Sequence, residues 1–450
     1  MLQREIEKKL IEWKNKKNKK ALCIIGARQI GKTTLVREFA KKNYDYFCEL
    51  NFFENPRAKE IFANDLDVNT IITGISAFLK MKLEPGKTLI FFDEIQQCPN
   101  VRCAIKFLVE DGRFDYIESG SLLGVNISDI PSLPVGFEEE YVMYPMSFKE
   151  FVIANGIQES TLSYLENCYN NLEKVNEAIH HTMLKLFYTY LVVGGMPEAV
   201  QIFVDTHDIA KVIEYQEMII NKYRQDISQY STKSEKEKIK AIFDSIPSQL
   251  NQKNKRFMIN SLDKNARLLR YQDCFNWLFD AGVALPCYNI MAPILPLELN
   301  TKRNLFKMYY GDTGLLSAAT MSDIQFDILQ GNLEINLGSI LENVVAQELK
   351  HNGFDLYYYD GTKVGEIDFV IKMNNNITLI EVKSGHTYTD HKALDNALTV
   401  KEWNIKNSFI LCKGNVMKEK SIYLPWYMIM FIKNKKIEKM IYDFEITNIH

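Results

Sequence analysis

Apolar and polar positions in the first third of the chain follow two alternating patterns. Short apolar runs predict strands, and these lie at residues 21–25, 46–51, 88–92 and 114–118. The stretches between them, such as 32–42, repeat their apolar residues at helical spacing instead. Because strands that alternate with helices form parallel sheets, this part of the chain is predicted to be an α/β domain.

Helical spacing dominates the middle of the chain, from residue 160 to 230. It is interrupted at Gly194-Gly-Met-Pro197, where the glycines can end one helix and the proline can begin the next. A lysine-rich helix then leads to a basic loop, a helix at 266–281 and a strand-like run at 283–290. This order is typical of a winged-helix module, which we expect here.

Mixed patterns return in the last part of the chain. A helix is expected at 338–352, and strands are expected near 356–360, 366–372, 377–383 and 407–412. The turn Asn374-Asn-Asn376 separates two of these strands, which we therefore expect to form a hairpin.

Composition places the chain among ordinary globular proteins, with 46% hydrophobic and 25% charged residues in a length of 450. The net charge of −3 excludes a generally basic protein, so nucleic-acid binding would depend on local patches. Eight cysteines without C-x-x-C spacing indicate a reducing compartment and no zinc site. The sequence shows no secretory signal and no apolar run of roughly 20 residues, so we expect a cytoplasmic protein that does not enter a membrane.

A phosphate-binding loop is the clearest motif. The segment Gly26-Ala-Arg-Gln-Ile-Gly31-Lys32-Thr33 matches G-x-x-x-x-G-K-[ST] between a predicted strand and a predicted helix. Its glycines let backbone N–H groups turn toward phosphate oxygens at the N-terminus of the helix. We expect Gly26, Gly31, Lys32, Thr33 and Thr34 to bind ATP, with the Thr33 hydroxyl also a ligand of Mg²⁺.

The strand at 88–92 ends in Asp93-Glu94. An aspartate at this place can hold Mg²⁺, and the following glutamate can activate the attacking water. We therefore expect Asp93 to bind the metal, directly or through water, and Glu94 to be the catalytic base. After the next strand, Ser119 or Ser121 can contact the terminal phosphate or the attacking water, and we place Ser121 in the nucleotide site; a helix N-cap is the alternative role for either serine.

An arginine finger, which would stabilise the negative charge in the transition state of ATP hydrolysis, cannot be chosen from the sequence. Four candidates, each also suited to the protein surface, are Arg28, Arg102, Arg113 and Arg224.

Five further segments carry a resemblance to a known family: Ser119-Gly-Ser121, Tyr144-Pro-Met-Ser-Phe-Lys-Glu-Phe151, Gly194-Gly-Met-Pro197, Tyr223-Arg-Gln-Asp-Ile227 and Asp312-Thr-Gly-Leu-Leu316. Together with the phosphate loop and Asp93-Glu94, they make the chain similar over nearly its full length to the bacterial and archaeal AAA-type ATPases that carry a DUF4143 domain. The resemblance implies an ATP-binding core, a winged-helix segment and a nuclease-like C-terminal domain. It also makes Gly195-Met-Pro197 similar to the Gly-x-Pro element that couples nucleotide state to conformation, with a plain helix break as the alternative. One departure is Gly136-Phe137, where many relatives have Gly-Arg.

Two acidic strands near the C-terminus form a second candidate site. Asp368 lies within one strand, and Glu381 and Lys383 end the next, on the same face because strand side chains alternate. Two carboxylates can hold Mg²⁺ beside a phosphodiester, and a lysine can orient water or offset developing charge. Glu342, on the preceding helix, can supply a third metal-binding carboxylate. Glu-x-Lys alone is common on exposed strands, but the four residues together resemble the PD-(D/E)xK nuclease superfamily.

The predicted fold is therefore α/β: an AAA-like P-loop NTPase core with a parallel sheet at 1–155, a helical subdomain at 156–230, a winged-helix-like segment at 231–305 and a PD-(D/E)xK nuclease-like α/β domain at 306–450. The main functional hypothesis is an ATPase that uses ATP and Mg²⁺ and acts on DNA through a metal-dependent nuclease domain. The alternative is a switch-type ATPase that binds DNA or a protein partner without cutting; a protein partner or a homo-oligomer fits either hypothesis. A membrane transport ATPase is disfavoured by the absence of apolar segments.

Overall fold

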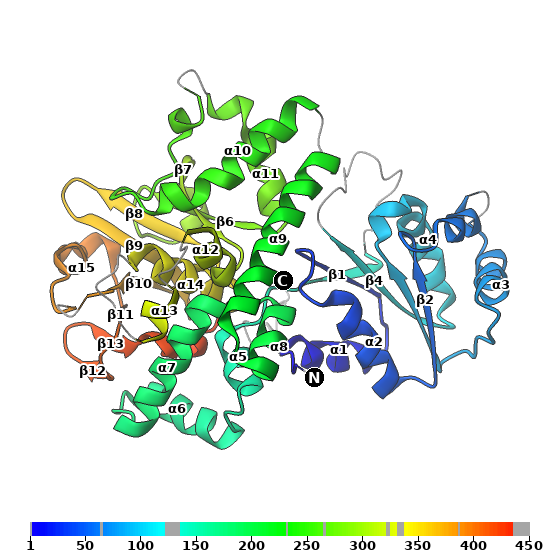
Figure 1. Cartoon of the computed structure of the whole chain (residues 1–450), viewed down its shortest axis with the longest axis horizontal. Coiled ribbons are helices and arrows are strands. Elements are labelled where there is room, and N and C mark those ends of the chain that lie inside the picture. Colours follow the sequence, from blue (N-terminus) through cyan, green and yellow to red (C-terminus); the bar gives the residue numbers. More distant parts are fainter. Residues whose placement is uncertain are drawn as a thin grey trace, which may run out of the picture.

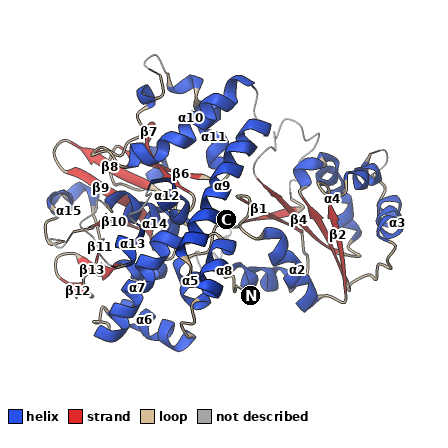
Figure 2. Cartoon of the chain, in the orientation of Figure 1, coloured by secondary structure: helices blue, strands red, loops and turns tan. Residues whose placement is uncertain are grey.

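The computed structural model describes residues 2–63, 66–121, 136–230, 233–263, 267–320, 325–330, 337–385 and 388–434. These residues form two β-sheets at opposite ends of the long axis, with a set of helices between them (Figures 1 and 2). Within the described part of the chain, no helix is both long enough and apolar enough to cross a bilayer.

The first sheet confirms the predicted parallel α/β core. Its order is β2-β3-β4-β1-β5, and every neighbouring pair is parallel. Its strands are β1 (Ala21–Gly26), β2 (Tyr46–Asn51), β3 (Thr88–Asp93), β4 (Asp115–Ser121) and β5 (Glu138–Val142). All six residues of the inner strand β3 are buried, because helices cover both faces of the sheet.

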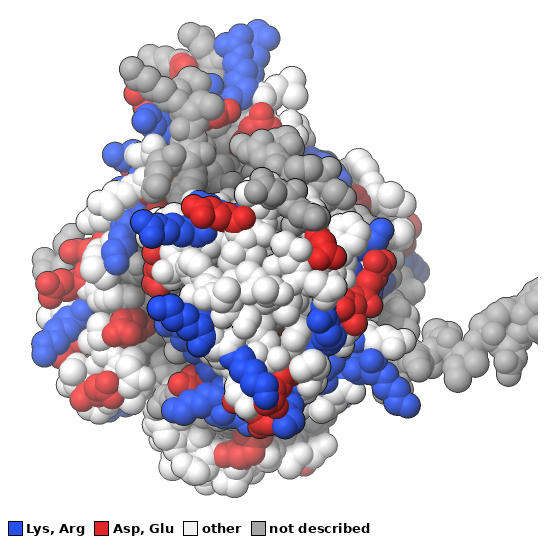
Figure 3. All heavy atoms as spheres, turned by 90° about the vertical axis from the view of Figure 1, so that its right-hand side faces the viewer, with Lys and Arg blue, Asp and Glu red and all other residues white. Residues whose placement is uncertain are grey.

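Alternating side chains of the first sheet pack into two different cores. Ile90 and Phe92 point toward α3 (Val68–Leu79) and α4 (Pro99–Asp111), on the outer side of the molecule. Leu89 and Phe91 belong to the core that contains α1 (Ile6–Lys14) and α2 (Lys32–Asn43) and that continues into the rest of the chain. Figure 3 shows the outer end of this half, where Lys, Arg, Asp and Glu side chains are interspersed around an uncharged centre.

Helices connect the two sheets. They are α5 (Phe148–Ala154), α6 (Glu159–Asn171), α7 (Glu177–Val193), α8 (Pro197–Thr206), α9 (Ile209–Tyr230), α10 (Lys233–Leu250) and α11 (Gln272–Asp280). The first of them begins with a capping box, in which the side chains of Ser147 and Glu150 each accept the other residue's backbone N–H. As expected from Gly194-Gly-Met-Pro197, α7 ends at Val193 with Gly194 (φ 69°) as its C-cap, and α8 begins at Pro197.

The second sheet lies at the other end of the molecule, in the order β12-β13-β11-β10-β9-β8-β6-β7. Its strands are β6 (Ala284–Ile290), β7 (Thr301–Tyr310), β8 (Tyr357–Gly361), β9 (Gly365–Met373), β10 (Asn376–Val382), β11 (Asn407–Cys412), β12 (Met417–Lys418) and β13 (Ile422–Pro425). The expected hairpin is present, since β9 and β10 pair antiparallel across Asn374 and Asn375, both with positive φ. Helix α14 (Gly338–His351) packs on this sheet.

One expected module has a different structure. The strand run at 283–290, predicted to be a wing, is β6, which pairs antiparallel with β7 and parallel with β8. It therefore belongs to the C-terminal sheet, and the expected domain boundary between 305 and 306 falls inside β7. An apolar run of seven residues does not reveal which strands it will pair with, because the partner β8 lies about 70 residues farther along the chain.

Candidate functional site

The phosphate loop connects β1 to α2 and requires glycine at both ends. A Cβ on Gly26 would lie 2.2 Å from the carbonyl oxygen of Met143, and Gly26 and Gly31 both have positive φ (152° and 87°). A side chain at either position would strain the backbone or collide with it. The loop thus keeps its N–H groups free of bulky neighbours at the start of an α-helix, the arrangement that binds phosphate.

Lys32 and Thr33 occupy the first turn of α2. The Lys32 ammonium donates hydrogen bonds to the carbonyl oxygens of Gly26 (2.9 Å) and Ala27 (2.7 Å). Burial lowers the pKa of Lys32 to about 8, because these neutral carbonyls compensate little for lost hydration. A phosphate beside Lys32 would supply the missing negative charge.

The Thr33 hydroxyl donates a hydrogen bond of 2.9 Å to Oδ2 of Asp93, at the end of β3. Two oxygens that Mg²⁺ accepts as ligands therefore lie side by side. Burial raises the pKa of Asp93, since the buried carboxylate has only neutral hydrogen-bond donors around it. The pair thus has the chemistry that suits a divalent cation, and the metal-binding roles of both residues stay a prediction.

Two further side chains form hydrogen bonds with Asp93. Only one of them, Ser119, was a candidate from the sequence. Ser119 donates to Oδ1 of Asp93, and the Asn51 side chain donates to Oδ2 at 2.9 Å. Asn51 ends β2 directly opposite Asp93 in the parallel register. A polar residue at the carboxyl end of a neighbouring strand was the available signal. The side chain of Ser121, our expected choice, lies outside the described residues.

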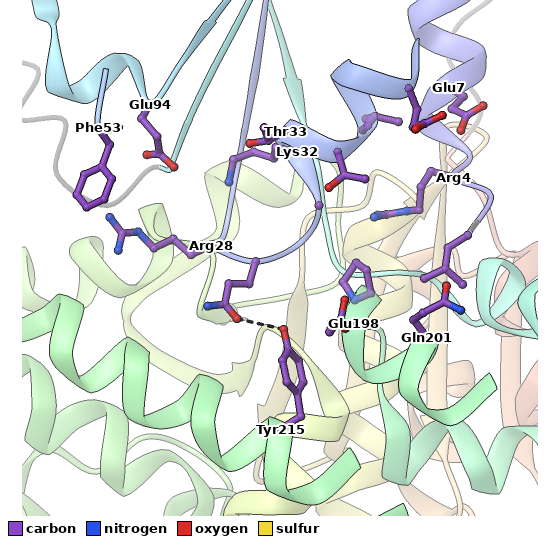
Figure 4. A pocket seen from close by; sticks show the side chains of 17 residues that line it. Arg4, Glu7, Arg28, Lys32, Thr33, Phe53, Glu94, Glu198, Gln201 and Tyr215 are labelled. Carbon is purple, nitrogen blue, oxygen red and sulfur yellow. Dashed lines mark hydrogen bonds between the residues drawn. The ribbon is translucent and has the colours of Figure 1, made fainter. Parts of the chain in front are cut away.

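Glu94 stands next to this group with a left-handed backbone (φ 56°, ψ 48°), which is uncommon for a residue with a side chain. Its carboxylate accepts a hydrogen bond from the side chain of Gln96 and lines the cavity in front of the loop. Figure 4 shows Glu94 beside Arg28 and Phe53, across the cavity from Arg4 and Glu7. A base for water activation can act from this position.

The cavity has a volume of 580 Å³, within the usual range for small-molecule sites. Lys32, Thr33, Thr34 and Gly31 line one wall, and Pro197, Glu198 and Gln201 of α8 line the opposite one (Figure 4). Tyr215 of α9 donates a hydrogen bond to the side chain of Gln29 in the loop (3.3 Å). The resemblance of Gly195-Met-Pro197 to a Gly-x-Pro element was a signal for the start of α8. The sequence offered none for Glu198, Gln201 and Tyr215, because their contact with the cavity depends on tertiary packing.

All four candidate arginines form ion pairs with carboxylates. The pairs are Arg28 with Asp226 (2.5 Å), Arg102 with Glu138 (2.7 Å), Arg113 with Asp111 (2.7 Å) and Arg224 with Asp244 (2.8 Å). Of these arginines, only Arg28 lines the cavity.

The hairpin β9–β10 brings Asp368, Glu381 and Lys383 together. Asp368 Oδ2 accepts the backbone N–H of Val382 (2.8 Å), and the Lys383 ammonium contacts Oε1 of Glu381 (2.8 Å). Burial, with the nearby charges of Glu381 and Glu342, raises the pKa of Asp368 well above its usual range. Burial also raises the pKa of Glu381, whose Oε2 has no hydrogen-bond partner. These two carboxylates suit a bound cation.

Glu342 does not complete a metal site with them as expected. Its Oε1 contacts the ammonium of Lys255, and its Oε2 accepts from Lys307 (3.3 Å) and from Tyr309 (3.0 Å). Against the effect of burial, the two lysines lower the pKa of Glu342. Across the described ranges, no group of three or more His, Cys, Asp or Glu side chains is placed to hold one metal ion. The sequence did not reveal this pairing, because Lys255 and Lys307 come from separate elements.

Family comparisons match three consecutive parts of the chain. Residues 18–152 match an AAA domain, residues 184–325 match a domain of unknown function, DUF8612, and residues 337–428 match the domain of unknown function DUF4143. The DUF8612 match runs across both boundaries expected at 230/231 and 305/306. A comparison with curated proteins gives no match.

Solved structures with a similar arrangement are distant in sequence. A Walker-type ATPase of Pyrococcus abyssi is 13% identical, covers 71% of this chain and 96% of its own, and has a TM-score of 0.44. The Orc1 protein of Aeropyrum pernix, solved in complex with DNA, is 11% identical, with 73% and 94% covered and a TM-score of 0.29. The Holliday junction branch migration motor RuvB of Thermotoga maritima is 15% identical, with 63% and 89% covered and a TM-score of 0.29. With the AAA match before its helical middle and the DUF4143 match after it, the chain combines an AAA-type P-loop ATPase domain with a DUF4143 domain.

Proposed function

We propose that this ATPase hydrolyses P-loop-bound ATP with Mg²⁺ and that its nucleotide state controls a second, metal-dependent site that acts on DNA. The observation that carries the proposal is the position of Asp312. This buried aspartate accepts the backbone N–H of Gly195 through Oδ2 (2.6 Å), close to the nucleotide cavity. It also begins the segment that is hydrogen-bonded to α14, the helix that carries Glu342 to the second site.

At the first site, each side chain has a distinct task. Lys32 neutralises charge on the terminal phosphates, while Thr33 and Asp93 would hold Mg²⁺, which stabilises the charge that develops during transfer. Asn51 and Ser119 fix the orientation of Asp93 through the hydrogen bonds described above. Glu94 accepts the proton of the attacking water.

Continuous contacts lead from this site to α14. Pro197 of α8 lies beside Gly31 of the loop, and Gly195 two residues earlier accepts the backbone N–H of Met146 (2.6 Å) and donates to Asp312. After Asp312, Thr313 donates from both its backbone N–H and its hydroxyl to the Gln347 side chain (2.8 Å each). A shift of α8 with nucleotide state would therefore act on α14.

Glu348, which follows Gln347 on α14, contacts α5 and α7. Glu348 accepts the backbone N–H of Phe148 (2.7 Å) and the hydroxyl of Tyr190 (3.2 Å). Burial raises the pKa of Glu348 to about 8 and that of Asp312 to about 6. Both carboxyl groups are buried within the connection, so movement of either would break hydrogen bonds that water cannot replace.

At the second site, Asp368 and Glu381 would hold the cation, and Lys383 would stabilise charge on a phosphodiester. Carboxylate pairs with an adjacent lysine suit hydrolysis of this bond, because the cation and the ammonium offset the negative charge of the transition state. Lys253, which is exposed, and Lys255, which is partly exposed, lie next to this site and would provide the local basic surface that a chain of net charge −3 needs for nucleic acid.

The experiment for this proposal is a cleavage assay on single-stranded, duplex and branched DNA, with Mg²⁺ and with or without ATP. We expect products from the intact chain and a loss of about 10²-fold or more in rate for Asp368→Asn, which keeps the size of the side chain but removes a charged ligand. Asp360→Asn, on the exposed part of β8, is the matched control and should cut normally. Intact DNA in every reaction would contradict the nuclease half.

A non-cleaving, switch-type ATPase is the second candidate function. The observation in its favour is that Glu342 is already neutralised by Lys255 and Lys307. In this case the C-terminal domain binds DNA or a protein partner and releases it according to nucleotide state, and the same assay gives nucleotide-dependent retention without products.

A further inference from the structure

A second cavity, of 340 Å³, lies beside the acidic site. It is lined by Leu250, Asn251, Gln252, Lys253, Lys255 and Ser339, at the junction of the α10 C-terminus with the start of α14. The lining contains two lysines and three uncharged polar side chains but no carboxylate. A cavity of this composition favours an anion with several hydrogen-bond acceptors.

Lys255 belongs to this cavity and to the acidic site at the same time. Its ammonium contacts Oε1 of Glu342, while its side chain lines the cavity and is 20% exposed. Lys307, the other partner of Glu342, is only 1% exposed and also pairs with Glu366 (2.5 Å). Lys307 is thus held from two sides, whereas Lys255 has room to turn toward an anion in the cavity.

The acidic site has an unused acceptor that makes the position of Lys255 important. Glu381 is 8% exposed, and its Oε2 has no hydrogen-bond partner. If Lys255 left Glu342, Oε1 of Glu342 would lose its contact as well, while Lys307 and Tyr309 would still hold Oε2. Two buried carboxylate oxygens would then lack partners, and a divalent cation is the species that satisfies such a pair.

We propose that the 340 Å³ cavity binds a backbone phosphate of a nucleic-acid strand, and that this phosphate draws Lys255 away from Glu342 and so opens the acidic site to a divalent cation. Lys255 is then a positioning residue that competes with the metal until the strand is present. The inference rests on the proposed function of the second site and names its phosphate contact and its control.

A strand is the appropriate source of the phosphate for a geometric reason. The cavity and the carboxylates are separated by a single side chain, Lys255, so one molecule must reach both places. A nucleic-acid strand carries phosphates at short, regular intervals and can place one in the cavity and the next at Asp368 and Glu381. Free ATP has phosphate groups but no chain of regularly spaced backbone phosphates, so it serves as the competing ligand in the test.

The first measurement is the affinity of the full-length chain for a fluorescently labelled single-stranded oligonucleotide, by anisotropy in EDTA over a range of salt concentrations. We expect Lys255→Met, which keeps the length of the side chain, to weaken binding at least fivefold and to reduce the slope of log K against log salt by about 0.7, the value for one lost phosphate contact. Lys253→Met should weaken binding as well, Lys255→Arg should restore it, and the exposed Lys401→Met is the matched control.

The second measurement is Mn²⁺ binding without nucleotide, by electron paramagnetic resonance of the free ion, with Asp368→Asn as the background. The Asp368-dependent affinity should rise at least threefold in Lys255→Met and stay unchanged in Lys253→Met. Adding the oligonucleotide to the unaltered protein should also raise the Asp368-dependent Mn²⁺ affinity at least threefold.

The outcomes separate the inference from the proposed function. Unchanged DNA affinity and salt slope in Lys255→Met would overturn the phosphate site. In Lys32→Ala, where ATP cannot act through the phosphate loop, competition by metal-free ATP as strong as that by unlabelled oligonucleotide would overturn the assignment to a strand. Equal Mn²⁺ affinity with and without Lys255 would overturn its competition with the metal. If no Asp368-dependent Mn²⁺ binding occurs in any variant, the metal-dependent function fails, while a Lys255-dependent DNA affinity still supports the cavity as a phosphate site.

Discussion

Glu94→Gln is expected to lower the turnover number for ATP hydrolysis by a factor of about 10² to 10⁴, the usual contribution of a general base. The amide keeps the size of the side chain at the rim of the 580 Å³ cavity but cannot accept a proton from water. Nucleotide affinity should stay within a few-fold of the original value, because Lys32 and the loop are unchanged. Phosphate release gives the rate, and titration with a fluorescent ATP analogue gives the affinity.

Glu54→Gln provides the control for this change. Glu54 is an exposed glutamate three residues after Asn51, so it tests whether loss of one negative charge near the site affects hydrolysis. We expect no change in its rate. Hydrolysis at the original rate in Glu94→Gln would mean that another group activates the water.

Gly194→Ala is expected to lower the free energy of unfolding by about 3 kcal/mol or more. Its φ of 69° and ψ of −161° fall in a region that only glycine adopts readily, at a cost of about 1–3 kcal/mol for another residue. The new Cβ would also lie 2.4 Å from Oδ1 of Asp312 and 2.6 Å from the backbone nitrogen of Gly314. Overpacking of this kind costs a further ~1–3 kcal/mol. Urea denaturation measures the difference.

Gly112→Ala is the matched control for this backbone change. Gly112 has the same φ of 69°, but a Cβ there would have no heavy atom within 4 Å. Its cost should be about 1–2 kcal/mol, that of an ordinary left-handed residue. Equal destabilisation by the two substitutions would show that the close packing of Gly194 against Asp312 and Gly314 contributes nothing.

Local sequence was sufficient for the parts of the molecule that are contiguous in the chain. The phosphate loop, the parallel first sheet and the β9–β10 hairpin follow from glycine positions, apolar periodicity and an asparagine turn. Asp93 was found because it ends an apolar strand. Its partner Asn51 also ends a predicted strand, but the sequence does not show that the two strands are neighbours in a register that places Asn51 opposite Asp93.

Contacts between segments far apart in the chain could not be predicted from the sequence, for a physical reason. The pairing of β6 with β8 depends on which strand edges remain free after folding, and a seven-residue apolar pattern is compatible with several partners. The same holds for Glu342, which was expected to bind a metal. Its pairing with Lys255, 87 residues earlier, depends on how the α10 region packs against α14.

The connection through Asp312 gives the two halves of the chain a common set of buried hydrogen bonds. The bonds join Gly195 to Asp312, and Thr313 to Gln347 of α14, so each one links two different elements. Because all of them form only in one arrangement of these elements, they fix the position of α14 relative to the nucleotide cavity. Such networks change as a unit when one member moves. A nucleotide that favours one arrangement can thereby bias the second site.

DNA affinity measured with ATP and with ADP tests this coupling most directly. The Glu94→Gln, Asp368→Asn double variant is expected to hydrolyse ATP slowly and to leave DNA intact, so anisotropy of a labelled oligonucleotide should report binding alone. We expect the dissociation constant to differ at least fivefold between the two nucleotides, DNA to change ATP affinity by the same factor, and Lys32→Ala to abolish the difference. The same DNA affinity with ATP, with ADP and without nucleotide would contradict the claim that the nucleotide site controls the second one.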